Sequence, residues 1–288
     1  MTAHRVARVD AHQHFWRYNA DEYGWIDDSM AALRRDFLPH DLEREIRRSD
    51  FDACVAVQAR QSLDETRWLL ALAEAHPFIV GVVGWVDLQS RDVERDLEGL
   101  GRHPKLVGIR HIAQSEPDDR FLLRPAFSRG LARLEEFGLA YDVLIYSRHL
   151  PVAAELAASL PRQRFVLDHL AKPDIRGRER VTWERDLRAL AARPNVWAKL
   201  SGLVTEADWT RWRPADLHPY LDVAFDCFGA ERLMIGSDWP VCTVAGDYQR
   251  TMRVVAEYVA NRPVDERDAV LGGNAMRFWN LQLPVAHA

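Results

Sequence analysis

The stretch VDAHQHFW, residues 9 to 16, sets three polar, protonatable side chains at alternate positions behind a short apolar start. Side chains on a β-strand point alternately to its two faces, so Asp10, His12 and His14 are predicted to share one face while Gln13 points to the other. Two adjacent histidines in a region of low dielectric would repel each other if both were charged. We therefore expect both to be neutral, and to bind a metal ion or an anion, or else to bond to backbone groups at the strand end.

Seven further apolar runs follow along the chain, separated by helical patterns. The eight candidate strands start near residues 5, 52, 79, 106, 139, 164, 195 and 232. They are nearly continuous in Val, Ile and Leu, as expected for parallel strands that are buried on both faces. Between them, Ser62 and Glu65 form a capping-box pattern, and Pro125 and Gly138 flank another helical segment.

The strand–helix alternation predicts an α/β protein with parallel strands and crossover helices. Eight such units in about 250 residues match a single (β/α)8 TIM barrel, here taken to span residues 1–288. An open doubly wound sheet is the rival architecture. The first strand is not followed by a G-x-G-x-x-G motif, and the chain has no P-loop, which counts against the nucleotide-binding form of that sheet.

Composition restricts the class of partner. The 288 residues are 48% apolar and 28% charged, which favours an ordinary soluble protein. The net charge of −5 gives no indication of binding to nucleic acid or to an anionic membrane. No apolar run is long enough to span a bilayer, and the first ten residues lack the apolar core of a signal peptide. The three cysteines are scattered, as in reduced thiols. We expect a cytoplasmic protein that binds a small molecule, and leave its oligomeric state open.

Active groups of a TIM barrel lie at the carboxyl ends of its strands, and several predicted strands end in polar residues. These residues are His12, His14, Arg110, His111, Tyr146, His169, Lys199, Ser201 and Asp238. Each has a structural alternative: a strand-end aspartate is often a helix N-cap, a lone histidine is often structural, and an arginine is often in an ion pair. The convergence of His12, His14, His169 and Asp238 on one barrel mouth nevertheless indicates a chemical site.

Aromatic residues near these positions are candidates for contact with an apolar face of a substrate. Trp25 falls in a long segment, residues 15–37, that is predicted to lie over the mouth, and Trp85 and Trp239 follow the third and eighth strands. Core packing is the alternative for each of them. Arg110 and His111 are neighbours on one strand, so only one of the two is expected to face the lumen.

The motifs VDAHQHFW, VGIRH, VLDHLAKP, KLSG, GSDWPVC and GGNAMRFW, in this order, resemble the amidohydrolase superfamily, and most closely its sugar-lactonase and dicarboxylate-lactonase branch. The resemblance covers residues 9 to 281. It implies a (β/α)8 barrel and hydrolysis at a carbonyl, here the opening of an L-fuconolactone-like aldonolactone to its sugar acid. It assigns the catalytic positions to His12, His14, His169 and Asp238.

The resemblance also bears on metal content. Metal-rich members use a lysine or glutamate after the fourth strand and a histidine after the fifth, where this chain has Arg110 or His111, and Tyr146. This departure argues against a two-metal site. A single divalent ion such as Zn²⁺ on His12, His14, His169 and Asp238 is compatible with the motifs, but we expect that it is not required.

In the implied mechanism Asp238 is the general base that activates water, and the three histidines and Arg110 stabilise the oxyanion. Substrate contacts are expected from Arg110, Tyr146, Lys199, Trp25, Trp85, Trp239 and His111. An aspartate is a poor base at its ordinary pKa, so we expect the pocket to raise the pKa of Asp238 and activity to increase from mildly acidic to mildly basic pH. The alternatives are a metal-dependent decarboxylase or another hydrolase of the superfamily, and a non-catalytic sugar-acid binder.

Overall fold

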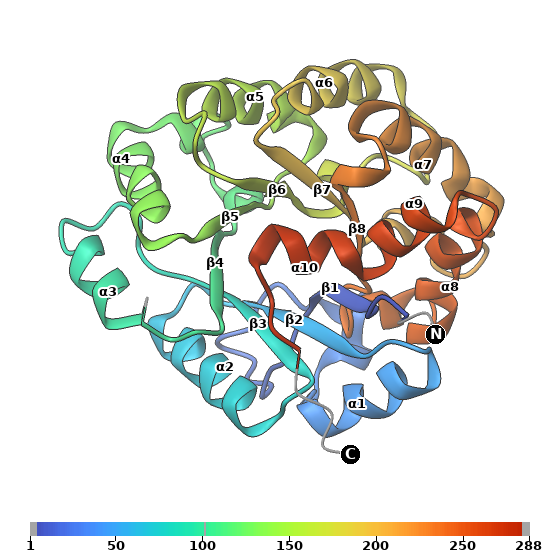
Figure 1. Ribbon diagram of the computed structural model, residues 1–288, viewed down its shortest axis with the longest axis horizontal. Coiled ribbons are helices and arrows are strands. Elements are labelled where there is room, and N and C mark those ends of the chain that lie inside the picture. Colours follow the sequence, from blue (N-terminus) through green and yellow to red (C-terminus); the bar gives the residue numbers. More distant parts are fainter. Residues whose placement is uncertain (1–4, 101, 284–288) are drawn as a thin grey trace.

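The computed structural model describes residues 5–100 and 102–283, and these form a nearly closed barrel of eight parallel strands surrounded by helices (Figure 1). Each strand pairs in parallel with the next, in the order β1 to β8. The strands are β1 (Val9–Gln13), β2 (Ala53–Val57), β3 (Ile79–Gly84), β4 (Leu106–His111), β5 (Ala140–Val143), β6 (Phe165–Leu167), β7 (Val196–Leu200) and β8 (Leu233–Ile235). The predicted (β/α)8 TIM barrel is confirmed, and each strand begins within four residues of its predicted start.

Helices follow the strands on the outside of the barrel, as right-handed crossovers require. They are α1 (Pro39–Arg48), α2 (Leu63–Ala75), α3 (Val93–Leu100), α4 (Pro125–Arg133), α5 (Leu150–Ser159), α6 (Val181–Ala191), α7 (Pro214–Phe228), α8 (Tyr248–Val259), α9 (Val264–Asp268) and α10 (Asn274–Trp279). No helix among these described segments is both long and apolar enough to cross a membrane.

The predicted capping box of α2 forms only in part. Ser62 caps the helix by accepting hydrogen bonds from the backbone N–H groups of Asp64 and Glu65. The carboxylate of Glu65 does not return the bond. It accepts instead from the N–H groups of Ala59 and Arg60, in the loop that leaves β2. Glu65 therefore fixes a loop at the barrel mouth rather than the end of its own helix.

The barrel closes between β1 and β8 through contacts near the mouth. The N–H of Asp238 donates to the carbonyl of His12 at 2.8 Å, and the N–H of His14 donates to the carbonyl of Trp239 at 2.6 Å. Below them, the carboxylate of Asp10 accepts from both the backbone N–H and the hydroxyl of Ser237. These bonds hold the first and last strands in one register, so residues more than 220 positions apart become neighbours.

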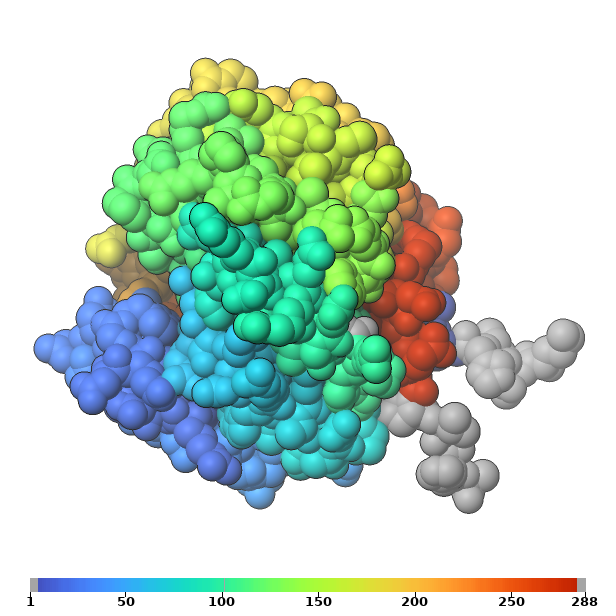
Figure 2. Space-filling model, turned by 90° about the vertical axis from the view of Figure 1, so that its left-hand side faces the viewer, coloured from blue at the N-terminus to red at the C-terminus, as the bar shows by residue number. Residues whose placement is uncertain are grey.

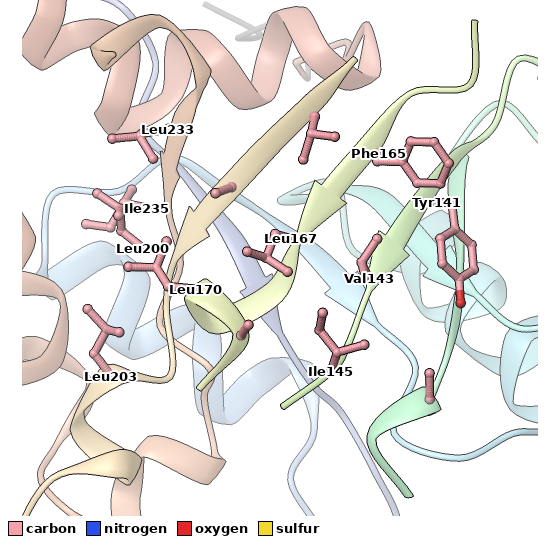
Figure 3. Packing of buried hydrophobic residues seen from close by; sticks show 14 of the residues in the cluster. Tyr141, Val143, Ile145, Phe165, Leu167, Leu170, Leu200, Leu203, Leu233 and Ile235 are labelled. Carbon is pink, nitrogen blue, oxygen red and sulfur yellow. The ribbon is translucent and has the colours of Figure 1, made fainter. Parts of the chain in front are cut away.

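Side chains on the strands pack in two directions, as expected for a barrel covered by helices. Figure 3 shows the outward set on the second half of the sheet, including Tyr141, Val143, Leu167, Leu200 and Ile235, which pack toward the helices. The inward set consists mainly of small and β-branched residues and fills the lower part of the lumen. It includes Val9, Ala11, Ala53, Val55, Val83, Ala140, Val166 and Met234.

The two ends of the barrel differ. Helix α10 crosses the end that faces the viewer in Figure 1, and its Phe278 and Trp279 pack against the inward set, so this end is plugged. The segment of residues 15–37, which contains the short 3-10 helix Asp28–Leu33, leaves the opposite end. In Figure 2 the blue, early part of the chain projects on the side opposite to the red α10. The chemistry-bearing strand ends lie at this second, open end.

Candidate active site

A cavity of about 620 Å³ lies at the carboxyl ends of the strands. His14, Arg110, His169 and Asp238 line it, and these residues are at least 95% buried. The rest of its wall comes from loops and includes both apolar and polar side chains. The apolar ones are Trp25, Met30, Ala59, Ile112, Leu144 and Val241, and the polar ones include Gln61, Gln114, Tyr146, Lys172, Thr205 and Glu206.

The structure brings the four sequence-predicted catalytic residues together around one carboxylate oxygen. The Nε2 atom of His14 lies 3.2 Å from Oδ1 of Asp238, and the Nε2 atoms of His12 and His169 each lie 3.8 Å from the same oxygen. His12 and His14 face each other with their Nε2 atoms 3.2 Å apart. His12 is fully buried and, unlike the other three, does not line the cavity.

Local backbone geometry makes this convergence possible. The pairing of β1 with β2 shifts register between Asp10 and Gln13, which interrupts strict alternation. The prediction that Asp10 shares a face with His12 and His14 is therefore wrong, because Asp10 is held against Ser237 away from the cavity. A Cβ on Gly236 would lie 2.8 Å from the Cβ of His12, so only glycine lets β8 approach this closely.

The hydrogen bonds of His14 restrict what can lie between its Nε2 atom and the carboxylate of Asp238. Its Nδ1 lies 2.8 Å from the carbonyl oxygen of Val57, which can only accept, so Nδ1 carries a proton. In neutral His14 the Nε2 atom then presents a lone pair to Asp238. A lone pair and a carboxylate oxygen at 3.2 Å repel unless a proton or a metal cation lies between them.

The donor set suits a single divalent ion. His12, His14 and Asp238 offer ligand atoms within 4.8 Å of one another, and imidazole nitrogen with carboxylate oxygen is a donor set that zinc accepts. Asp168, His169 and His12 form a second such group. In that group, however, Asp168 is already paired with two cationic side chains, so its oxygens are less available to a metal.

Electrostatics at the centre differ from the sequence expectation. Burial disfavours the ionised form of Asp238, but the neighbouring imidazoles of His169, His14 and His12 outweigh it, and the pKa of Asp238 falls below its ordinary value. The predicted upward shift of this pKa is therefore wrong. Burial lowers the pKa of His169 to about 4 and that of His12 well below its ordinary value, so both are neutral at pH 7, as expected for His12.

Arg110 is the residue of its pair that faces the lumen, and its donors are already used. Its Nε and Nη2 donate to the side-chain oxygen of Gln58 at 3.1 and 2.9 Å, and Nη2 also donates to the backbone carbonyl of Gln58. Its Nη1 donates to Asp168 at 2.9 Å and lies 3.3 Å from Nε2 of His12. Arg110 therefore supplies fixed positive charge behind the cavity and has few N–H groups left for a substrate.

Lys199 lies one layer deeper than predicted. Its ammonium is fully buried, pairs with Asp142, and lies 3.0 Å from Asp168 and 3.2 Å from Nδ1 of His12. Burial raises the pKa of Asp142 to about 7. For Asp168 burial is outweighed by the charge of Lys199 and the hydrogen bond from His12, which hold the pKa of Asp168 well below its usual range. Lys199 supports His12 from below and does not line the cavity that a substrate would enter.

Comparison with known proteins identifies the family of this chain. The amidohydrolase family model matches residues 9–281. The chain belongs to this amidohydrolase family. Two relatives are L-fucono-1,5-lactonases: one from Burkholderia multivorans is 44% identical over 96% of this chain and 97% of its own length, and one from Burkholderia ambifaria is 40% identical over the same shares. A crystal structure of a B. multivorans amidohydrolase with bound zinc superimposes with a TM-score of 0.92 at 42% identity, over 96% of this chain and 100% of that one.

The remaining predicted contact residues of this amidohydrolase fall into two groups. Trp25 and Tyr146 line the cavity and are 42% and 38% exposed. His111, Trp85 and Trp239 do not line it. Trp85 and His111 contact each other, and the Nε1 of Trp85 donates to Nδ1 of His111 at 3.3 Å.

The positions of these three residues have simple causes. His111 points away from the lumen because it follows Arg110 on β4, and it bonds to Glu116 and stacks on Phe121. Trp239 packs edge-on against Phe15 and Phe37 as part of the hydrophobic core. A substrate in the cavity therefore does not meet these side chains, nor Lys199 below them.

Sequence reasoning missed several residues of the amidohydrolase site. Asp168 directly precedes His169, and Gln58 follows β2, so both were visible as polar residues at strand ends. Lys172 and Glu206 carried no such indication, because they lie on the turns that follow β6 and β7. Turn conformation, and not strand alternation, brings these two side chains to the cavity.

Proposed function

We propose that this protein is a lactonase that opens a sugar lactone to the sugar acid, and that L-fucono-1,5-lactone is the first substrate to test. The observation that carries the proposal is the ionised Asp238 carboxylate, with His14 and His169 beside it, in a cavity lined by both polar and apolar side chains. The 44% and 40% identical L-fucono-1,5-lactonases support the choice of substrate.

In the proposed reaction Asp238 takes a proton from water as the water oxygen attacks the lactone carbonyl carbon. The resulting oxyanion receives a hydrogen bond from Nε2 of His169. In this arrangement Nδ1 of His169 accepts a hydrogen bond from the hydroxyl of Ser201, 2.9 Å away. When the ring C–O bond breaks, Asp238 returns the proton to the ring oxygen. Because the pKa of Asp238 is low, the proton is passed on at once and does not remain on the carboxylate.

A divalent ion on His12, His14, His169 and Asp238 would polarise the carbonyl and activate water when bound. We propose that this ion assists but is not required, since an ester is a reactive acyl group and Arg110 already places a positive charge behind the site. His12 could join the ligands only with its Nε2 lone pair free, which needs the proton on Nδ1. In the structure Nδ1 lies 3.3 Å from Oδ1 of Asp168, which can accept that proton, and 3.2 Å from Nζ of Lys199.

A pH-indicator assay on a panel of aldonolactones, run with and without a chelator, tests the proposal. We expect acid release from L-fucono-1,5-lactone, with lower rates on lactones of other configuration, and most of the activity retained after chelation. Release of carbon dioxide from an aromatic carboxylate, or saturable sugar-acid binding without turnover of any lactone, would overturn the proposal. Loss of activity on chelation, restored by Zn²⁺, would overturn only the metal-independent form.

A further inference from the structure

The turn that follows β6 has an unusual backbone. His169, Leu170, Ala171 and Lys172 all have positive φ, at 54°, 49°, 59° and 51°, and none is glycine. Left-handed conformation is unfavourable for such residues and persists only where surrounding contacts enforce it. Here the indole of Trp183 donates to the carbonyl of Leu170 at 2.7 Å, and other contacts hold the rest of the turn.

The consequence of this turn is that two side chains three positions apart enter the same cavity. The N–H of Lys172 donates to the carbonyl of His169 at 2.8 Å, which closes one left-handed turn, and both side chains line the cavity. Backbone strain of this kind concentrates at functional sites. Placing His169 in the cavity would explain a strained backbone at that one residue. The left-handed conformation, however, continues through Lys172.

Lys172 differs from the other cation of the cavity wall. Arg110 directs its N–H groups to Gln58, Asp168 and His12. No carboxylate of the described residues lies within 4.0 Å of the Lys172 ammonium, which lies over the ring of Tyr146, 5.5 Å from the ring centre. The three donors of this ammonium are therefore available to a ligand.

Glu206 provides the complementary acceptor on the same wall. It lies on the turn after β7 and lines the cavity together with Lys172. Burial raises the pKa of Glu206, while the nearby charge of Lys172 opposes that shift. Trp25, Met30 and Val241 contribute apolar surface to the same cavity. The cavity thus offers a donor, an acceptor and hydrocarbon surface to one ligand.

We propose that Lys172 and Glu206 recognise the ring hydroxyls of the substrate, Lys172 by donating to them and Glu206 by accepting from them, and so select a polyhydroxylated lactone over an unsubstituted one. The proposal rests on the lactonase function proposed above and names its specificity determinants. A neutral sugar lactone offers hydroxyls that both donate and accept, which matches this pair, and its remaining carbon surface matches the apolar lining residues.

The test compares kcat/KM on two lactones, L-fucono-1,5-lactone and unsubstituted δ-valerolactone, for the wild type, Lys172→Met and Glu206→Gln. Each substitution is expected to lower kcat/KM on the sugar lactone about 10- to 100-fold, the size of one hydrogen bond to a charged group, and to change it less than about 3-fold on δ-valerolactone. Lys172→Arg, which keeps a charged donor, should restore part of the loss.

Arg148→Met is the matched control. Arg148 also lies over the ring of Tyr146, at 5.0 Å, but pairs with Asp119 outside the cavity, so its removal should leave both substrates unaffected. Equal losses on both lactones for Lys172→Met would mean that Lys172 only supports the turn that carries His169, and would overturn the proposal. If the ratio of kcat/KM on the two lactones were unchanged from wild type in both variants, the proposal would also be overturned. A wild type inactive on both lactones would refute the lactonase function itself, and this inference with it.

Discussion

Asp238 offers the sharpest test at the scale of a single residue. Asp238→Asn keeps the shape of the side chain and its backbone bond to His12 but removes the negative charge that accepts the proton of water. We expect the rate of lactone hydrolysis to fall by a factor of about 10² to 10⁴. Steady-state kinetics with the thermal midpoint as the folding control would measure this. Near-normal turnover in a folded variant would contradict the assigned role.

The pH dependence of activity follows from the same residues. Asp238 has a lowered pKa and stays ionised through the neutral range, and His169, with a pKa of about 4, is neutral above that value. Activity should therefore be level from about pH 6 to about pH 8 and decline only toward the pKa of His169, where the added positive charge beside Asp238 weakens that carboxylate as a base. A steady rise between pH 6 and 8 in kcat/KM would show that another base controls the rate.

The site residues were predictable where side-chain alternation and the position of strand ends decide which side chains face the cavity. They were less predictable where the depth of a side chain along the barrel axis decides it. The same rule selected both Asp238 and Lys199 as strand-end residues. Asp238 reaches the cavity, whereas Lys199 lies in the layer below. Depth in a barrel depends on the stagger between neighbouring strands, which no local pattern records. The pKa of Asp238 escaped prediction for a related reason, because it depends on which imidazoles come close to it.

At the scale of elements, the buried ion network joins β4, β5, β6 and β7 through Arg110, Asp142, Asp168 and Lys199. Lys199→Met would leave Asp142 and Asp168 without their shared cation in a region closed to water. Removal of one partner from a buried ion pair costs about 3–5 kcal/mol, so we expect a loss of unfolding free energy of that size. Urea unfolding followed by circular dichroism would measure it.

Asp142→Asn should be much milder, at about 1 kcal/mol, because Asp168 remains to pair with Lys199. Burial raises the pKa of Asp142 to about 7, so its folded form favours the proton and the protein loses stability as pH rises through that value. The Asn variant lacks this loss. Its stability relative to wild type should therefore increase from pH 5 to pH 8, and an opposite slope would contradict the raised pKa.

The order of strands and helices was more predictable than the conformation of the turns and the roles of individual side chains near them. Eight apolar runs and the helical patterns between them determined the order of strands and helices, because burial on both faces leaves a strong hydrophobic record. The left-handed turn at residues 169–172 left no such record, since it contains no glycine and its conformation is imposed by contacts from α6 and the loop after β5. Glu65 likewise showed a capping pattern but serves the loop after β2.

At the scale of the whole molecule, the barrel separates chemistry from stability along its axis. The open end carries Asp238 and its histidines, and the other end is plugged by α10, whose Trp279 lies under the ammonium of Lys199 at 5.2 Å from the ring centre. Between these ends the lumen changes from ionic to apolar. In barrels of this type the face opposite the active site contributes to stability and not to chemistry.

Trp279→Ala tests this separation. Trp279 is 4% exposed, and its truncation would leave a large void beneath the lumen, so the unfolding free energy should fall by about 3–5 kcal/mol. Because the folded fraction keeps the open end intact, kcat per folded molecule at 25 °C should change less than about 3-fold, the reverse of the pattern expected for Asp238→Asn. Combined urea unfolding and kinetics at matched folded concentration would measure both. A parallel collapse of kcat would mean that the plug sets the position of His12 through Lys199, and that the two ends of the barrel are coupled.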